Sequence, residues 1–317
     1  MTEQPFVSYI MPTYNAERYL ARSLGSIFTQ TYPRDRYEVL VADGGSTDRT
    51  REVLSAYPVT LIENPRRDAE SGKYLAIQRS RGEICILLDS DNIIADPDWL
   101  ARSLAPLKED PWLIGVESAP LLARDFTSVN EYANLLVIAD PLARMLASTP
   151  HIEKRSGYLV KHFARGACPV SGANGFLWRR SVIEECINHE ARVFAETNAL
   201  AALAERRALS YAYLPGSGVY HYYCGDLADF AGKRRKIAGK FLARKARKEH
   251  TWVDTRGRAL FVLAGIYLGS GVGPALEGTY RALATGHTAW LWHPVASFIT
   301  IRIYAAHYIR ARFGRRP

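Results

Sequence analysis

Strand and helix signals alternate along the first 116 residues, and this alternation constrains the fold more than any other feature of the chain. Short apolar runs are typical of buried strands, and apolar residues at helical spacing are typical of amphipathic helices. Their alternation predicts crossover units and a mostly parallel α/β sheet with helices on both faces. We expect strands at 6–11, 37–42, 59–62, 84–88 and 113–116, and helices at 16–30, 48–57, 69–81 and 98–107.

The remainder of the chain is organised differently. Its middle is irregular, and its last part is rich in apolar helical segments. A length of 317 residues fits one or two domains. We expect a first domain over 1–225, with halves at 1–116 and 117–225, and a helical region over 226–317. Further helices are expected at 129–147 and 196–207.

The cysteine pattern argues against a disulfide scaffold or a zinc cluster. The four cysteines are scattered without a CxxC pair, which is typical of a reducing compartment. They are Cys85, Cys168, Cys186 and Cys224. We also expect no signal peptide, because residues 1–5 contain no basic segment that leads into an apolar one.

The positive charge of the chain has a local origin. The net charge is +9, and the segment from Lys233 to Lys248 contains nine Lys or Arg residues and no acidic residue. Basic residues recur there at helical spacing, at Lys233, Lys236, Lys240, Arg244 and Arg247. Such a helix lies on an anionic membrane surface or presents a solvated face. Nucleic acid is a weaker candidate, because no binding motif accompanies the charge.

Two uncharged segments follow the basic helix, at 259–276 and 285–301. Their lengths lie near the lower limit for spanning a bilayer, and the glycines and the proline of 269–274 weaken the first as a straight helix. The segments form a re-entrant or surface-bound hairpin, or they pack against another subunit. We favour membrane attachment, because the basic helix precedes them and four arginines follow between 310 and 316.

Three expected strands end in polar sequences. These are Pro12-Thr13-Tyr14-Asn15, Asp43-Gly44-Gly45-Ser46-Thr47-Asp48 and Asp89-Ser90-Asp91. Ligands of open sheets bind beyond the carboxyl ends of the strands, and two carboxylates one residue apart can hold a divalent cation that binds phosphates. The strand ends therefore predict a nucleotide diphosphate site. For any single Asp here, a helix cap or a turn is the alternative.

With Gly82-Glu83-Ile84 and Gly172-Ala173-Asn174-Gly175, these motifs make about the first 225 residues similar to a family 2 glycosyltransferase of the GT-A fold. The resemblance implies a Rossmann-like sheet flanked by helices. It also implies transfer of a sugar from a nucleotide-sugar donor, with Mg²⁺ or Mn²⁺ and with inversion at the anomeric carbon. UDP is the expected nucleotide, and GDP and dTDP remain open.

The resemblance assigns nucleotide contacts to Pro12, Thr13, Tyr14, Glu17, Asp43, Lys73, Asp89 and Ser90. Tyr14 would pack against the base. Asp43 would accept a hydrogen bond from the base edge, or it would shape the turn that follows. Lys73 would contact a phosphate, or it would be an ordinary exposed helical lysine.

The expected metal ligands are Asp91, Asp89 and His221. Asp91 would bind the metal directly, whereas Asp89 would also contact the ribose or order the loop. His221 would complete the metal shell or contact the diphosphate, or it would be a packed histidine among aromatic residues, because imidazole does not suit Mg²⁺ best. Arg234 and Arg235 would close over the diphosphate from a mobile loop, or they would belong to the basic helix.

Glu196 is the expected catalytic base, which takes the proton of the acceptor. Relatives commonly have Glu-Asp at this point, whereas this chain has Glu196-Thr197, so the alternative is a glutamate that interacts with a helix dipole. Gly172 and Asn174 would contact the donor sugar, or they would form an ordinary turn.

The expected function is non-processive sugar transfer, because the Gln-x-x-Arg-Trp motif of polymerising relatives is absent. The acceptor would be lipid-linked, at the cytoplasmic face of a membrane. The alternatives are a soluble, possibly homo-oligomeric transferase for a small or protein acceptor, and a non-catalytic nucleotide-sugar binding protein. A dehydrogenase and an ATPase are disfavoured, because neither a Gly-rich dinucleotide turn nor a P-loop is present.

Overall fold

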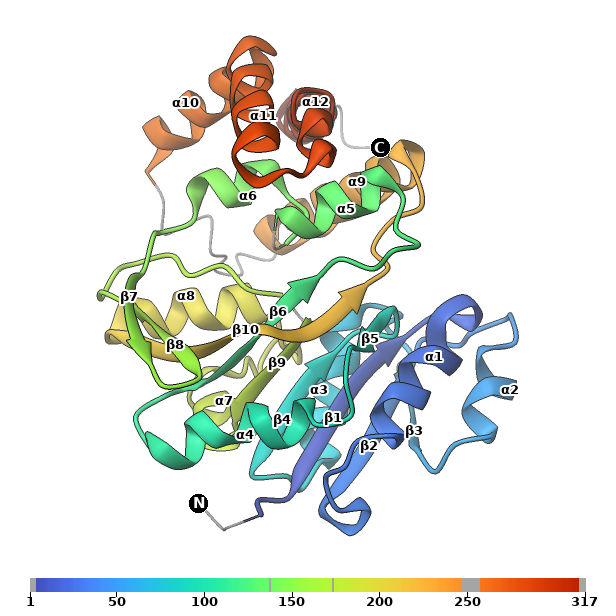
Figure 1. Ribbon diagram of the computed structural model, residues 1–317. Helices are drawn as coiled ribbons and strands as arrows, with labels where there is room; N and C mark the ends of the chain where they lie inside the picture. The colour runs from blue at the N-terminus through green and yellow to red at the C-terminus, as the bar shows by residue number, and fades with distance from the viewer. Residues whose placement is uncertain (1–3, 137, 173, 247–256, 314–317) are drawn as a thin grey trace. The chain divides into compact units, whose positions relative to one another are not determined.

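The computed structural model describes residues 4–136, 138–172, 174–246 and 257–313 (Figure 1). The chain forms two compact units. The first comprises the chain up to Leu121 together with Thr149–His221, and the second comprises Leu122–Ser148 and the chain from Tyr222 onward. The segment 122–148, which we expected in the first domain, thus belongs to the second unit, because its helices pack with C-terminal helices.

The first unit contains every strand of the described residues and six α-helices. The strands are β1 (Val7–Thr13), β2 (Tyr37–Asp43), β3 (Thr60–Glu63), β4 (Ile84–Leu88), β5 (Asn92–Ile94), β6 (Gly115–Leu121), β7 (His151–Arg155), β8 (Tyr158–Phe163), β9 (Asn174–Arg179) and β10 (Leu209–His221). The helices are α1 (Glu17–Phe28), α2 (Thr50–Ser55), α3 (Ala69–Arg79), α4 (Trp99–Glu109), α7 (Arg180–Cys186) and α8 (Glu196–Arg206), with a short 3₁₀ helix, η1 (Arg34–Arg36).

The strands form one sheet in the order β3-β2-β1-β4-β9-β6-β10-β8-β7, and β5 pairs with β10. As expected, β1 runs parallel to β2 and β4, and β2 runs parallel to β3. However, β9 runs antiparallel to β4 and β6, and β7 and β8 form an antiparallel hairpin. The sheet is therefore mixed rather than mostly parallel. The hairpin turns at Gly157, whose φ is +85°, and such a turn joins only antiparallel strands.

Helices cover both faces of this sheet (Figure 1). Side chains alternate between the faces along each strand. Tyr9 and Met11 of β1 belong to a core with α1 and α4, whereas Ile10 belongs to a second core with α3, α7 and α8. Every residue of β1 and of β4 is buried, which explains their nearly continuous apolar sequences.

The second unit is helical. Its elements are α5 (Ser128–Leu135), α6 (Pro141–Leu146), α9 (Leu227–Ala246), α10 (Arg258–Gly269), α11 (Val272–Thr285), the 3₁₀ helix η3 (Thr288–Trp292) and α12 (His293–Phe313). The single helix expected over 129–147 is two helices, because Asp140 accepts hydrogen bonds from the backbone of Leu142 and Ala143 and so caps the start of α6. The basic helix is confirmed as α9, while Arg247 lies outside the described residues.

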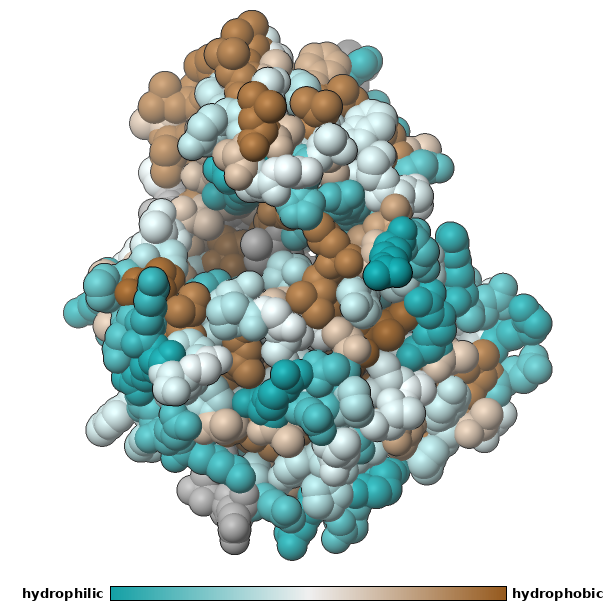
Figure 2. Space-filling view, in the orientation of Figure 1, coloured by the Kyte–Doolittle hydropathy of each residue, from teal (hydrophilic) through white to brown (hydrophobic). Residues whose placement is uncertain are grey.

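The apolar segment at 259–276 bends inside the second unit. Among the described residues no single helix is long and apolar enough to cross a membrane, although α10 and α11 together reach that composition across a bend of 75°. The bend lies at Gly271, whose φ is +71°. Brown, hydrophobic side chains gather over α10 and α11 in Figure 2.

A bulge in β10 determines where His221 lies. Against β6, the register of β10 shifts between Leu214 and Gly218. Beyond the shift, β10 pairs with β5, and His221 lies opposite Asn92. Gly218 permits this path, because a Cβ there would lie 1.8 Å from the carbonyl oxygen of Ala119.

Gly218→Ala should therefore destabilise the protein by about 3 kcal/mol, because the added methyl group meets backbone that has no room to move. Chemical denaturation measures this cost. Gly232→Ala is the matched control: it lies in α9, its Cβ would meet nothing within 4 Å, and its cost should be close to zero. Equal stability of the two variants would contradict the packing that we describe at the bulge.

Candidate active site

The polar ends of three neighbouring strands meet at one edge of the sheet. Thr13 at the end of β1 is the register partner of Asp43 at the end of β2, and the Gly44 N–H donates to the Thr13 carbonyl at 2.9 Å. On the other side of β1, β4 leads directly into Asp89. The predicted strand-end residues are therefore brought together, as parallel pairing requires.

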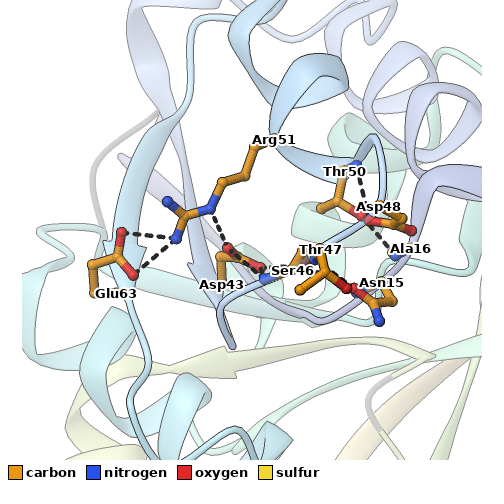
Figure 3. A network of polar contacts seen from close by, with 9 residues as sticks. All are labelled: Asn15, Ala16, Asp43, Ser46, Thr47, Asp48, Thr50, Arg51 and Glu63. Carbon is orange, nitrogen blue, oxygen red and sulfur yellow. Dashed lines mark hydrogen bonds and ion pairs between the residues drawn. The ribbon is translucent and has the colours of Figure 1, made fainter.

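Asp43 organises the loop that follows β2 (Figure 3). Its carboxylate is fully buried and accepts hydrogen bonds from the Ser46 N–H, the Ser46 hydroxyl at 2.5 Å and Arg51 Nε at 2.8 Å. Arg51 in turn binds both carboxylate oxygens of Glu63 at 2.9 Å. Asp43 thus has the turn-shaping role, and its contact with a nucleotide base stays a prediction.

The loop is also attached to the residues after β1 (Figure 3). The side chain of Asn15 accepts from the Thr47 N–H at 2.9 Å, and the Ala16 N–H donates to the Thr50 hydroxyl at 2.7 Å. Glu17 accepts from the Arg49 N–H at 3.0 Å, so its carboxylate holds the same loop. The segments that follow β1 and β2 are therefore held together by hydrogen bonds.

Tyr14 is an accessible aromatic side chain beside this loop. About half of it, 48%, is exposed, and it lies so close to Gly44 that a Cβ there would come within 3.2 Å of its ring. Pro12 and Thr13 are buried beneath it at the end of β1. Tyr14 is thus accessible to a ligand, and its contact with a nucleotide base stays a prediction.

Lys73 lies between two carboxylates. It comes from α3, and its ammonium lies 2.5 Å from Glu196 Oε1 and 3.6 Å from Asp89 Oδ1. The Lys73 and Glu196 side chains are almost entirely buried, at 6% and 9% exposure. The prediction of an exposed helical lysine as the alternative is therefore wrong, and the phosphate contact stays a prediction.

These charges shift one another's pKa values. Burial raises the pKa of the Glu196 and Asp89 carboxyls, although the charge of Lys73 opposes both shifts. Burial alone would lower the pKa of Lys73, but the two carboxylates outweigh it and raise that pKa above its ordinary value. Lys73 therefore remains an ammonium ion at neutral pH.

The three expected metal ligands also come from this edge. His221 Nε2 lies 3.4 Å from Asp91 Oδ1, and Asp89 precedes Asp91 in the same loop. No group of three or more His, Cys, Asp or Glu side chains is placed to hold a metal anywhere in the described ranges. Asp89 Oδ1 is nevertheless buried and accepts no hydrogen bond from any described residue. These residues thus fit a divalent cation that takes its other ligands from phosphate and water oxygens.

The remaining predicted residues of the first unit are Ser90, Gly172 and Asn174. Ser90 is half-buried between Asp89 and Asp91, and Asn174 at the start of β9 pairs with Leu88, directly before Asp89. Gly172 is half-buried and precedes this strand, and Ala173 lies outside the described residues. Thr197, next to Glu196, donates from its hydroxyl to the Ser171 carbonyl at 2.7 Å, which connects this segment to α8.

Arg234 and Arg235 belong to the second unit. Both lie within α9, so they belong to the basic helix, which was the alternative prediction, rather than to a mobile loop. Arg234 is fully buried, with Nη1 2.8 Å from Asp140 Oδ2 and a hydrogen bond to the Tyr223 hydroxyl. Arg235 is exposed. Both arginines are helical because the basic run continues a helix that begins at Leu227.

Asp43→Ala should destabilise the protein by about 2 kcal/mol, because the variant leaves a buried turn without its acceptor and Arg51 without its buried partner. Glu63→Ala removes the exposed partner of the same arginine, and it should cost less than about 0.5 kcal/mol. Chemical denaturation compares the two. A larger cost for Glu63→Ala would show that Asp43 does not support the loop.

The chain is similar to known glycosyltransferases. Residues 8–117 match the model of the family described as Glycosyl transferase family 2. "Glycosyltransferase AglE" of Haloferax volcanii is 34% identical over 109 residues, which is 32% of this chain and 36% of that protein. "Validoxylamine A glucosyltransferase" of Streptomyces hygroscopicus subsp. limoneus is 45% identical over 107 residues, or 32% of this chain and 23% of that protein. The matched part therefore spans about a third or less of these relatives.

Two solved structures share the fold. "Mannosyltransferase PcManGT from Pyrobaculum calidifontis", in complex with GDP-Man and Mn²⁺, has a TM-score of 0.60 at 21% identity, over 99% of this chain and 89% of that chain. S. aureus TarS 1-349 in complex with UDP has a TM-score of 0.52 at 18% identity, over 98% and 92%. The mixed sheet with flanking helices is thus confirmed as close to GT-A structures. Within this fold, residues 8–117 are the part of the chain that is similar to glycosyl transferase family 2.

Proposed function

We propose that the protein is a glycosyltransferase that transfers a hexose-type sugar from a nucleotide-sugar donor, without processivity and with inversion. The observation that carries the proposal is the cluster of Asp43, Asp89, Asp91 and Glu196 around the carboxyl ends of neighbouring strands. Exposed Tyr14 supports a base contact, and the open Oδ1 atom of Asp89 supports a cation contact. UDP is the expected nucleotide, and a GDP-sugar is the alternative.

Glu196 would act as the base. An acceptor hydroxyl oxygen would attack the anomeric carbon on the face opposite the diphosphate, and Glu196 would accept the hydroxyl proton. The bond to the acceptor forms while the bond to the diphosphate oxygen breaks, and this inverts the anomeric centre. Because burial raises the pKa of Glu196, it is a stronger base than an ordinary glutamate, while Lys73 favours its ionised form.

A divalent cation, Mg²⁺ or Mn²⁺, would be held by Asp91, Asp89 and His221. Bound there, it would supply Lewis-acid stabilisation of the charge that develops on the leaving diphosphate. The Mn²⁺ in the similar Pyrobaculum structure supports this role, as do the GDP-Man and UDP of the two similar structures.

The acceptor would be lipid-linked or close to a membrane, and the product would belong to glycan or cell-envelope polysaccharide biosynthesis. Exposed apolar side chains on α10 and α11 support attachment of the second unit to a cytoplasmic membrane face. Ile266, Leu276 and Leu283 are 66%, 69% and 82% exposed. The charged residues of α11, Glu277 and Arg281, are turned inward, half-buried and paired at 2.7 Å.

Glu196→Gln should lower kcat by about 10²- to 10³-fold, because a general base acts only in the transition state. The Kd for UDP or GDP with Mn²⁺ should change less than about threefold, since the nucleotide does not depend on that proton transfer. Transfer assays and calorimetry measure both. Glu190→Gln, an exposed glutamate before the same helix, is the matched control and should keep full activity.

If Glu196→Gln retains kcat, another group is the base. If the unmodified protein binds nucleotide sugars but turns none over with lipid-phosphate acceptors, it is a non-catalytic nucleotide-sugar binding protein.

The double variant Leu276→Asp/Leu283→Asp should bind liposomes at least about tenfold more weakly than the unmodified protein. Each substitution replaces an apolar side chain that would insert among lipids. Flotation with liposomes that contain anionic lipid measures this. Ser55→Asp/Thr60→Asp adds the same charge to exposed positions of the first unit and should leave binding unchanged. If the unmodified protein does not float but forms oligomers, α10 and α11 contact another subunit, as the soluble alternative requires.

A further inference from the structure

Lys73 is a buried cation beside the proposed metal ligands. Its side chain is 6% exposed, and its ammonium lies between Glu196 Oε1 at 2.5 Å and Asp89 Oδ1 at 3.6 Å. A lysine is almost never buried to this extent unless it is paired. Here one ammonium compensates part of the charge of two carboxylates.

The backbone around Lys73 fixes the position of its ammonium. α3 begins at a cap in which Asp68 accepts from the Ser71 N–H at 2.8 Å. The Phe194 N–H donates to the Glu70 carbonyl at 2.9 Å, so the start of α3 is joined to the residues just before α8. Lys73 and Glu196 project from these two joined helix starts. The ammonium is therefore part of the folded site rather than a mobile side chain that happens to lie near Asp89.

The position of Lys73 has a consequence for cation binding. Asp89 Oδ1 is the buried acceptor that is open for a metal, yet a unit positive charge already lies 3.6 Å from it. A divalent cation on the same oxygen would lie close to that charge, and repulsion over such distances is strong where water is largely excluded. A diphosphate brings negative charge that offsets both cations.

We propose that the positive charge of Lys73 repels a metal ion from Asp89. The site therefore retains a divalent metal only together with a nucleotide diphosphate. Lys73 is thus a positioning residue that couples the binding of metal and nucleotide. This inference rests on the proposed function, since it requires a nucleotide and a metal to share the site.

Binding of Mn²⁺ alone tests the proposal, without any turnover. Free and bound Mn²⁺ are distinguished by electron paramagnetic resonance in the full chain, first without nucleotide and then with UDP or GDP. Lys73→Met should bind Mn²⁺ alone at least about tenfold more tightly than the unmodified protein, because the repelling charge is gone. The factor by which nucleotide strengthens Mn²⁺ binding should fall correspondingly, since coupling between two ligands is reciprocal.

The sign of the change separates this role from simple packing. If Lys73 only supports Asp89, its loss weakens Mn²⁺ binding, and equal or weaker binding by folded Lys73→Met would overturn the proposal. Lys73→Met/Glu196→Gln leaves no unpaired buried glutamate, so it should fold normally and show the same gain. Lys108→Met removes an exposed lysine as a control and should show none. If the unmodified protein binds neither nucleotide with Mn²⁺, the proposed function fails and the coupling role fails with it. If it binds them but Lys73→Met shows no gain, only the role of Lys73 fails.

Discussion

The site depends on the parallel pairing of β1 with β2 and β4. Every residue of β1 and β4 is buried and neither strand contains a charged residue, so carboxylates can begin only where these strands end. Pairing in register then brings these ends to one edge, with Thr13 beside Asp43 and Asp89 one strand away. The same hydrophobic burial that stabilises the sheet therefore concentrates carboxylates in one small region, where their repulsion must be offset.

Two cations offset that repulsion, the exposed Arg51 and the buried Lys73. Arg51 pairs with fully buried Asp43, and Lys73 pairs with Glu196 and Asp89. Each cation comes from a helix that packs beside the strand ends, α2 in the first case and α3 in the second. A carboxylate cluster without them would be costly to bury. The arrangement keeps several negative groups at the strand ends, and one of them, Asp89 Oδ1, lies 3.6 Å from the Lys73 ammonium and accepts no hydrogen bond from any described residue.

Much of this could be predicted from the sequence, because β1, β2 and β4 have apolar runs followed by polar motifs. The antiparallel direction of β9 could not be predicted, because the hydrophobic pattern of residues 174–179 suits a parallel and an antiparallel strand equally. The environment of Lys73 was also out of reach, because its partner Glu196 is 123 residues away along the chain. Arg51 was also missed, although it lies only 8 residues after Asp43, because only the folded loop shows that the two side chains bind each other.

We propose that these strand ends hold a nucleotide diphosphate together with a divalent cation. A crystal structure with Mn²⁺ and either UDP or GDP, measured at an X-ray energy where manganese scatters anomalously, tests it most directly. We expect an anomalous peak in contact with the Asp91 carboxylate and with the diphosphate. The nucleotide base should lie against Tyr14. A nucleotide or a manganese peak at any other place would contradict it.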